Sequence, residues 1–247
     1  MNSKKISRSL AKSLLFNMYK IRNVELKIAE LYTEQEMRCP VHLSVGQEAV
    51  AVGVCHFLSN NDNILSAHRS HAHYIAKGGN VDEMLGELYG KETGCAKGKG
   101  GSMHLIDLKV GLIAAVPIVG STIPIGVGAA WGKKLKGEKN KTVIFFGEGA
   151  TETGVFHESI GFAALHKIPV IFVCENNLYS VYTHVENRQA KNRSLKNIVE
   201  GHGIKHLHGN GNNVMEVYNI ANEAIKHVQD IQAANAFLLQ SLLLLLF

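Results

Sequence analysis

The clearest structural pattern in this chain lies in residues 142–177, TVIFFGEGATETGVFHESIGFAALHKIPVIFVCENN. The β-branched and aromatic run 142–146 is typical of a strand buried on both faces, and residues 168–174 repeat that pattern. Residues 151–166 between them predict a helix with acidic side chains near its start. A strand–helix–strand unit of this kind implies two parallel strands joined by a right-handed crossover. We therefore expect an α/β fold in which helices flank a parallel sheet.

The segments around this unit predict mainly helices. Apolar residues at helical spacing over 6–34 indicate a long amphipathic helix, and the short apolar run 64–67 indicates a further strand. No internal repeat or long linker divides the sequence, so we expect a single domain over residues 1–247, with an atypical tail at about 230–247. Further helices are expected from 46 to 58, after His68, and over 81–90, 120–132, 194–200 and 214–228.

The composition excludes several classes of protein. The chain is 46% hydrophobic, which excludes a disordered protein, and its net charge of +5 comes without a basic arm or a nucleic-acid-binding motif. The strongly apolar run 237–247 is too short to span a bilayer, and the N-terminal residues form no signal-peptide core. We therefore expect a cytoplasmic protein that binds neither nucleic acid nor a membrane.

Polar residues follow both strands of the 142–177 unit, at the edge where ligands gather in parallel sheets. Glu148 lies between two glycines after the first strand, and Asn177 follows the second. A carboxylate and an amide oxygen are hard ligands suited to Mg²⁺ or Ca²⁺. The helix expected to start near Gly149 offers NH groups to a phosphate. A divalent ion bridging a diphosphate is the expected occupant, and the alternative is a tight turn after one strand and an amide cap after the other.

Four motifs in order along the chain resemble one family. Gly147-Glu148-Gly149 ending at Glu175-Asn176-Asn177 is similar to the thiamine diphosphate motif, which opens GDG and closes NN. Three further segments make the family resemblance more specific: residues 42–49, HLSVGQEA, residues 94–104, GCAKGKGGSMH, and residues 118–120, IVG. Over residues 12–228 the chain resembles the α subunit of the E1 component of 2-oxo acid dehydrogenase complexes, which include pyruvate, branched-chain and acetoin enzymes. The resemblance implies a thiamine diphosphate-binding fold.

The resemblance also implies the roles of individual residues. Glu148 stands where the family usually has an Asp as its Mg²⁺ ligand, Asn177 matches the second ligand, and Tyr179 matches the residue that supplies a backbone carbonyl. The other implied positions bind the cofactor: Arg69 at the diphosphate, His68 at a position often held by Tyr, Gly147, Gly149 and Ala150 along the diphosphate, and Val119 at the aminopyrimidine. We take His71 and His104 as candidate catalytic residues.

Partners and chemistry follow from the same resemblance. The α subunit of this family mainly holds the diphosphate and the metal, while a separate E1 β subunit supplies the glutamate that activates the aminopyrimidine. The resemblance therefore implies an α2β2 heterotetramer that oxidatively decarboxylates a small 2-oxo acid, or cleaves acetoin, and passes the acyl group to a lipoyl E2 component. The stretch Ser66–His73, SAHRSHAH, is more similar to acetoin-type than to pyruvate-type members.

Several of these residues have simpler interpretations. Arg69 can be a surface arginine, and Val119 taken alone can belong to the core. His68, His71 and His73 have a spacing that can also suggest zinc, although no cysteine or carboxylate completes such a site locally. His104 and His42 can line a substrate entrance or only cap loops. A nucleotide-binding module is disfavoured, because neither a GxGxxG nor a Walker A pattern is present.

The sequence also departs from the family pattern. Glu in place of Asp at position 148 adds one methylene, which we expect to shift the ion rather than abolish its binding, and Pro117 stands where many members have a small residue. After about Asp230 the sequence becomes IQAANAFLLQSLLLLLF and contains no histidine loop of the kind that closes over the diphosphate. This end resembles a truncated gene. The rival interpretation is therefore a catalytically inactive subunit that turns over no cofactor.

Overall fold

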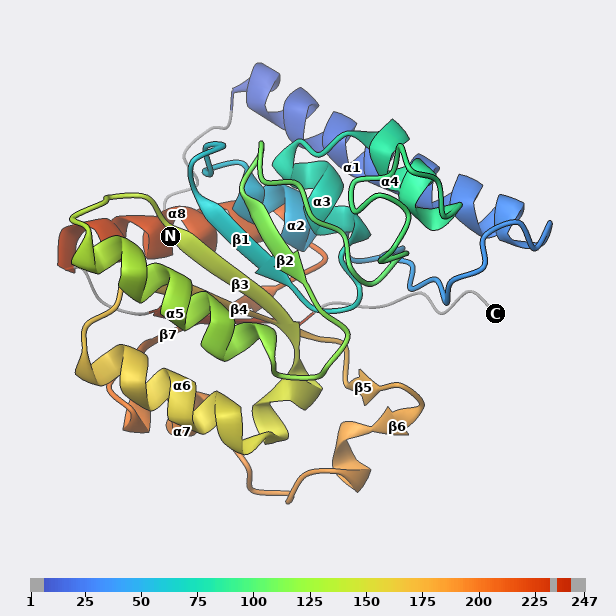
Figure 1. Cartoon of the computed structure of the whole chain (residues 1–247). Coiled ribbons are helices and arrows are strands. Elements are labelled where there is room, and N and C mark those ends of the chain that lie inside the picture. Colours follow the sequence, from blue (N-terminus) through green and yellow to red (C-terminus); the bar gives the residue numbers. More distant parts are fainter. Residues whose placement is uncertain (1–6, 232–234, 241–247) are drawn as a thin grey trace.

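The computed structural model describes residues 7–231 and 235–240 and contains a parallel sheet with helices on both faces (Figure 1). The sheet has six strands in the order β2-β1-β3-β4-β8-β7, and every neighbouring pair is parallel. This confirms the expected fold class. The strands are β1 Asn63–Ser66, β2 Leu112–Ala115, β3 Thr142–Gly147, β4 Val170–Asn176, β7 Lys205–Asn210 and β8 Asn235–Gln240.

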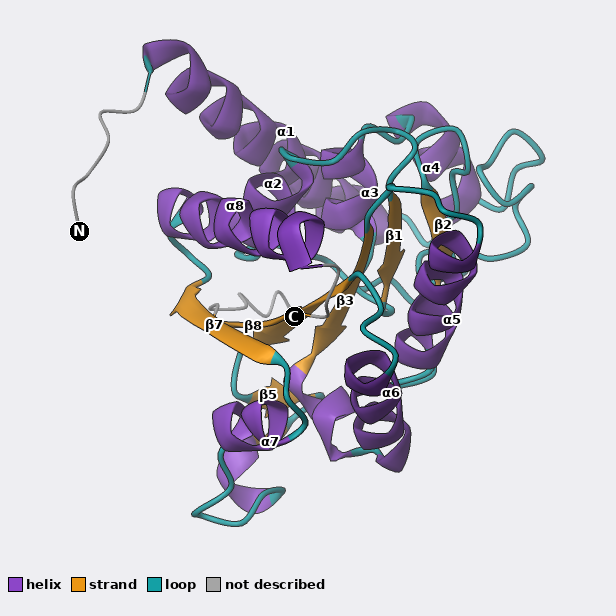
Figure 2. Cartoon of the chain, turned by 90° about the vertical axis from the view of Figure 1, so that its left-hand side faces the viewer, coloured by secondary structure: helices purple, strands orange, loops and turns teal. Residues whose placement is uncertain are grey.

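Two layers of helices cover the sheet, and Figure 2 shows them on opposite sides of it. Helices α1, α2, α3, α4 and α8 pack with one face of the strands, and α5, α6 and α7 pack with the other. The predicted helices are thereby confirmed in type and close to their expected bounds. They are α1 Arg8–Tyr32, α2 Glu48–Cys55, α3 His71–Lys77, α4 Val81–Leu88, α5 Thr122–Leu135, α6 Gly154–Leu165, α7 Leu195–Gly201 and α8 Val214–Ile231.

The central strand β3 explains why its sequence is apolar at every position. Val143 and Phe145 join the core beneath α1, α2 and α8, whereas Ile144 and Phe146 join the core beneath α5 and α6. All four side chains are at most 2% exposed. A strand that is buried on both faces needs no polar side, and the run of β-branched and aromatic residues follows from that.

The structure differs from the sequence-based expectations at several element boundaries. The helix expected over 151–166 begins only at Gly154, because a 3₁₀ turn, η1 (Glu148–Glu152), comes first. Strands β2 and β7 were not predicted, and neither was the antiparallel hairpin of β5 (Tyr179–Ser180) and β6 (Thr183–His184). Each of these strands is short or mixes polar with apolar residues, so period-two patterning in the sequence is weak.

Part of the segment that the sequence marks as an atypical tail belongs to the sheet. Strand β8 pairs in parallel with β4 on one side and with β7 on the other, with Ile171 and Lys205 both opposite Asn235. Residues 232–234 and 241–247, which include most of the leucine run, lie outside the described residues. Over the described part of the chain, no helix is long and apolar enough to cross a membrane.

A glycine on α5 allows this helix to approach β3 closely. A Cβ atom added at Gly126 would lie 2.5 Å from Cγ1 and Cδ1 of Ile144 and 3.2 Å from Cδ1 of Leu65. Gly128, two positions further along the same helix, has nothing within 4 Å of the corresponding point. The two glycines therefore differ in packing, although they share one helix.

We predict that Gly126→Ala lowers the free energy of unfolding by about 1–3 kcal/mol, because the methyl group forces α5 away from β3. Gly128→Ala is the matched control and should raise it by up to about 1 kcal/mol, because alanine favours the helix. Urea unfolding of the three proteins measures both changes. Equal effects of the two substitutions would contradict the close approach at Gly126.

Candidate functional site

The strand register brings the two polar turns of the 142–177 unit together. In the pairing of β3 with β4, Gly147 lies opposite Glu175, so Glu148 and Asn177 both emerge just beyond the carboxyl edge of the sheet. The Glu148 residue is only 4% exposed, although it lies in a turn. The sequence prediction that these two turns meet at one edge is consistent with this register.

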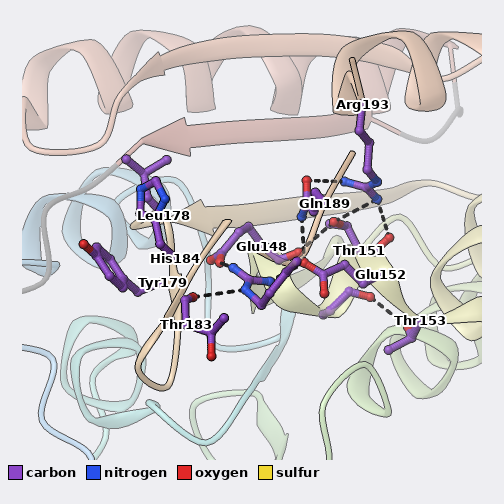
Figure 3. Close-up of polar contacts among 12 residues, drawn as sticks. Glu148, Thr151, Glu152, Thr153, Leu178, Tyr179, Thr183, His184, Gln189 and Arg193 are labelled. Atoms are coloured by element: carbon purple, nitrogen blue, oxygen red, sulfur yellow. Dashed lines mark hydrogen bonds and ion pairs between the residues drawn. The ribbon is translucent and has the colours of Figure 1, made fainter. Parts of the chain in front are cut away.

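The carboxylate of Glu148 pairs with an arginine that the sequence analysis did not identify. Nη2 of Arg188 contacts Oε1 of Glu148, and Nη1 of the same guanidinium contacts Oε1 of Glu152. Nε of Arg188 donates to the carbonyl of Thr183 at 3.1 Å. Figure 3 shows the cluster, with Glu148 and Glu152 on η1 beside the chain that carries Thr183 and Gln189. Burial raises the pKa of Glu148, and the contact with Arg188 opposes that rise.

The turn after β4 is held by its own asparagines. The amide of Leu178 donates to Oδ1 of Asn176 at 2.9 Å, and the amide of Tyr179 donates to Oδ1 of Asn177 at 2.8 Å. Leu178 and Val181 both adopt positive φ angles, 69° and 56°, which are uncommon for residues with large or branched side chains. Strained backbone of this kind concentrates at functional sites. Oδ1 of Asn177 retains a second lone pair that can face a metal ion.

Gly149 lies close to the hairpin that follows β4. A Cβ atom at Gly149 would be 2.9 Å from Oγ of Ser180 and 3.6 Å from Nη1 of Arg188. Only a glycine therefore fits between η1 and the hairpin without displacing a neighbour. Ala150 is buried, and its carbonyl accepts from Oγ1 of Thr153 at 2.7 Å. The alternative of a tight turn after β3 and an amide cap after β4 matches features of this corner, since η1 follows β3 and Oδ1 of Asn177 caps the turn after β4.

The loop between β2 and α5 reaches the same corner. At Gly120, where φ is +84°, a Cβ atom would lie 2.8 Å from Oγ1 of Thr153, next to the start of α6. Val119 is 50% exposed and Ile118 is 69% exposed. The interpretation of Val119 as a core residue is therefore wrong in this structure, because its side chain lies outside both hydrophobic cores.

Arg69 and His68 follow β1 in a half-buried position. The Arg69 guanidinium donates to the carbonyl of Leu43. Burial lowers the pKa of Arg69, and the carboxylates of Glu175 and Glu25 offset part of this. Because Arg69 is half-buried and lies close to buried carboxylates, it does not fit the interpretation as a simple surface arginine. Its charge is held near the carboxyl edge of the sheet.

The imidazole of His68 is neutral at physiological pH. Burial, followed by the charges of Arg69 and His42, lowers the pKa of His68 to about 4. The rings of His42 and His68 meet edge to face, with centroids 4.9 Å apart. The pKa of His42 is lowered as well, mainly by burial. Two neutral imidazoles beside one guanidinium offer hydrogen-bonding groups without adding charge.

The candidate catalytic histidines have different surroundings. His71 is completely buried: Nδ1 lies 3.2 Å from Oε2 of Glu25, and Nε2 lies 2.8 Å from Oγ of Ser102. Both ring nitrogens are thus engaged within the protein, and the structure does not bring His71 to the Glu148 corner as an open side chain. His104 is exposed, and its Nδ1 lies 2.8 Å from the carbonyl of Gly100.

The alternative interpretation of His68, His71 and His73 as a zinc site finds no support. His73 stacks on Phe145, with ring centroids 4.0 Å apart, and its Nδ1 lies 2.8 Å from Oγ of Ser66. Nε2 of His73 lies 3.4 Å from Oε2 of Glu175 without forming a hydrogen bond. Among residues 7–231 and 235–240, no group of three histidine, cysteine or acidic side chains is arranged to hold a metal ion.

The glycine-lysine loop 94–101 wraps around a buried carboxylate of the protein itself. Oε2 of Glu87 accepts from the amides of Ala96 and Gly98, both at 2.8 Å. Oε1 accepts from Gly100 at 2.7 Å and from Gly101 at 3.0 Å. Burial alone would raise the pKa of Glu87, but these four amides hold it below its usual value. The loop amides therefore serve Glu87 rather than an external anion.

Comparison with known proteins identifies relatives over most of the chain. The family model of the dehydrogenase E1 component matches residues 16–234. The α subunit of acetoin:2,6-dichlorophenolindophenol oxidoreductase from Bacillus subtilis is 42% identical over 213 residues, which are 86% of this chain and 64% of that protein. The pyruvate dehydrogenase E1 α subunit of Rickettsia felis is 38% identical over 214 residues, 87% of this chain and 65% of that protein.

The same comparisons give the share of each relative that the chain matches. The chain spans less than two thirds of the length of both proteins. Among solved structures, transketolase from Campylobacter jejuni superposes with a TM-score of 0.67 over 93% of this chain and 38% of that one. The sequence identity is 17%, so this similarity concerns the fold alone.

We predict that Glu87→Gln lowers the free energy of unfolding at pH 7 by about 2–4 kcal/mol, because the buried loop amides lose their charged acceptor. Glu83→Gln, on the same helix and outside this network, is the control. The folded-state pKa of Glu87 lies below the ordinary value of 4.5, so its contribution is complete above pH 4.5 and disappears as the pH falls through the lower value. Urea unfolding at several pH values should show the wild-type advantage shrinking in acid. An advantage that stays constant down to pH 2 would refute this role.

Proposed function

The chain belongs to the dehydrogenase E1 component family, and from this membership we propose that it is an α subunit that holds thiamine diphosphate and Mg²⁺. The observation that carries the proposal is the register of β3 with β4, which sets Glu148 and Asn177 at one edge of the sheet. That edge is where cofactors bind in open parallel sheets.

The proposed metal ligands are the Glu148 carboxylate, Oδ1 of Asn177 and the backbone carbonyl of Tyr179. All three are oxygen donors, which is the chemistry that Mg²⁺ requires. The burial of the Glu148 carboxylate supports the proposal. A buried carboxylate needs a cation beside it, and a bound metal ion can meet that need.

The proposed diphosphate site lies beside these ligands. Gly147, Gly149 and Ala150 contribute backbone along η1, where Gly149 has no room for a side chain. Arg69 supplies a guanidinium, and the neutral His68 supplies a hydrogen-bonding ring without charge. Val119 is exposed on the loop that approaches the start of α6, which suits a contact with the aminopyrimidine ring.

The proposed reaction is oxidative decarboxylation of a 2-oxo acid or cleavage of acetoin. Bound thiamine diphosphate would supply the nucleophilic carbon and an electron sink for the cleaved bond. The side chains of this chain would orient the cofactor and neutralise its diphosphate, while a β subunit would provide the activating carboxylate and a lipoyl E2 component would accept the acyl group. His104, exposed beside the glycine-lysine loop, is the proposed candidate for contact with substrate.

The substrate is proposed at the level of a class. The curated relatives include acetoin-type and pyruvate-type α subunits, at 42% and 38% identity. The histidine-rich stretch Ser66–His73 favours acetoin. Assaying the chain with a β subunit, with acetoin and with pyruvate, decides between them.

We predict that Glu148→Ala abolishes Mg²⁺-dependent binding of thiamine diphosphate, because the variant lacks the charged metal ligand. Isothermal titration with the cofactor, with and without Mg²⁺, measures this directly. Glu158→Ala is the matched control, because Glu158 is exposed on α6. Unchanged cofactor affinity in Glu148→Ala would defeat the metal role of this residue. A wild-type chain that binds neither Mg²⁺ nor the cofactor would instead support the inactive-subunit alternative.

Arg69→Gln should weaken cofactor binding by about ten- to a hundredfold, since a charge-assisted contact with the diphosphate is lost. Binding of the metal ion alone should stay within about twofold, because the proposed metal ligands do not include Arg69. Arg38→Gln removes the same charge from an exposed position and serves as the control. Equal cofactor affinity in Arg69→Gln and Arg38→Gln would exclude Arg69 from the site.

A further inference from the structure

The cation that pairs with Glu148 belongs to the chain itself. Arg188 follows the short 3₁₀ turn η2 (Val185–Asn187), forty positions after Glu148, and reaches back to η1. Its side chain is 12% exposed and the Glu148 side chain is 5% exposed, so the pair is largely withdrawn from water. This contact has no place in the proposed cofactor site, and the family resemblance does not predict it.

Arg188 and a metal ion would compete for the same carboxylate. Nη2 of Arg188 contacts Oε1 of Glu148, and a Mg²⁺ ligand must approach the ion to about 2.1 Å. Two cations at one largely buried carboxylate repel each other with little solvent screening. A metal ion bound at Oε1 of Glu148 therefore requires the guanidinium to withdraw from that oxygen, whereas Oε2 can accept an ion with Arg188 in place.

The structure provides a position to which Arg188 can withdraw. Nη1 of the same guanidinium already contacts Glu152, and Nε donates to the carbonyl of Thr183. The contact with Glu152 can persist when the guanidinium turns away from Glu148. Glu152 is held in place by a second donor, because Nε2 of Gln189 lies 2.7 Å from its Oε1.

The rest of the segment is tied to η1 by contacts that do not involve the Glu148 carboxylate. Nη2 of Arg193 donates to the carbonyl of Thr151 at 2.6 Å, and Nη1 donates to Oε1 of Gln189 at 3.0 Å. Figure 3 shows Arg193 approaching Thr151 and Gln189 from the far end of the cluster. A movement of Arg188 is thus confined between two anchors, Thr183 and Arg193.

We propose that Arg188 is an internal counterion that holds Glu148 when no metal is bound and is displaced onto Glu152 by the metal ion. Arg188 thereby sets the affinity of the site for divalent cations, and metal binding is linked to the conformation of residues 183–193. The inference rests on the proposed function, because it takes Glu148 as the metal ligand. Arg188 is a positioning residue, since it acts on the metal through Glu148.

The test measures the binding of Mn²⁺ to the chain without cofactor, by electron paramagnetic resonance of the free ion. Arg188→Gln should bind Mn²⁺ about tenfold more tightly than wild type, because the internal competitor is gone. Glu152→Gln should bind more weakly, because Arg188 loses its alternative acceptor. The control is Arg193→Gln, which removes the same charge from the same segment but breaks only the contacts with Thr151 and Gln189. Its affinity should match wild type.

Hydrogen exchange gives a second readout that does not depend on affinity. In wild type, Mn²⁺ should increase amide exchange in peptides that cover residues 183–193, since the Glu148 contact is broken. In Arg188→Gln, exchange in these peptides should be high already and should not respond to the ion. If Arg188→Gln fails to fold, the weaker binding of Glu152→Gln and the wild-type exchange still test the proposal.

The outcomes separate this inference from the proposed function. If wild type and Arg188→Gln bind Mn²⁺ equally well, the metal site stands and the role of Arg188 is overturned. If Arg193→Gln tightens binding as much as Arg188→Gln, the effect is one of net charge, and the proposal is likewise overturned. If no variant binds Mn²⁺, with or without thiamine diphosphate, the metal site itself falls and this inference falls with it.

Discussion

The parallel pairing of β3 with β4 is the constraint on which the rest of the site depends. Both strands are buried on both faces, so successive side chains enter different hydrophobic cores. A slip of one residue would move each side chain to the opposite layer, and the packing of α5 against Ile144 would be lost. The register that satisfies both cores is also the one that sets Gly147 opposite Glu175 and brings Glu148 and Asn177 to one edge.

Buried carboxylates in this structure have polar neighbours that come from other parts of the chain. Glu148 faces Arg188, Glu25 faces His71, Glu175 lies beside His73, and Glu87 is enclosed by loop amides. An uncompensated charge in such positions would be costly, so each pair ties segments that are distant in sequence to one another. The glycines of the 94–101 loop also serve a buried carboxylate, because they let the backbone close around Glu87.

The sequence predicted the fold class because its evidence was local and periodic. The strands over 142–146 and 168–174 and the long helix over 6–34 have strong patterns, and the structure contains each of them. Strand β7, KHLHGN, alternates poorly, and β8 lies in a segment whose leucine run gives no strand signal of its own. Their place in the sheet depends on which neighbours offer unpaired backbone groups, and no local pattern contains that information.

The amino-acid pattern was enough to predict which residues end the two central strands and that their polar side chains share an edge, because the apolar runs and the polar residues that end them are local features of the sequence. The partners of those side chains became apparent only from the three-dimensional packing. Arg188 reaches Glu148 across forty positions, and Glu25 reaches His71 across forty-six. Such pairs depend on how helices and loops pack in three dimensions, where the cost of burying a charge selects the nearest group that can compensate it.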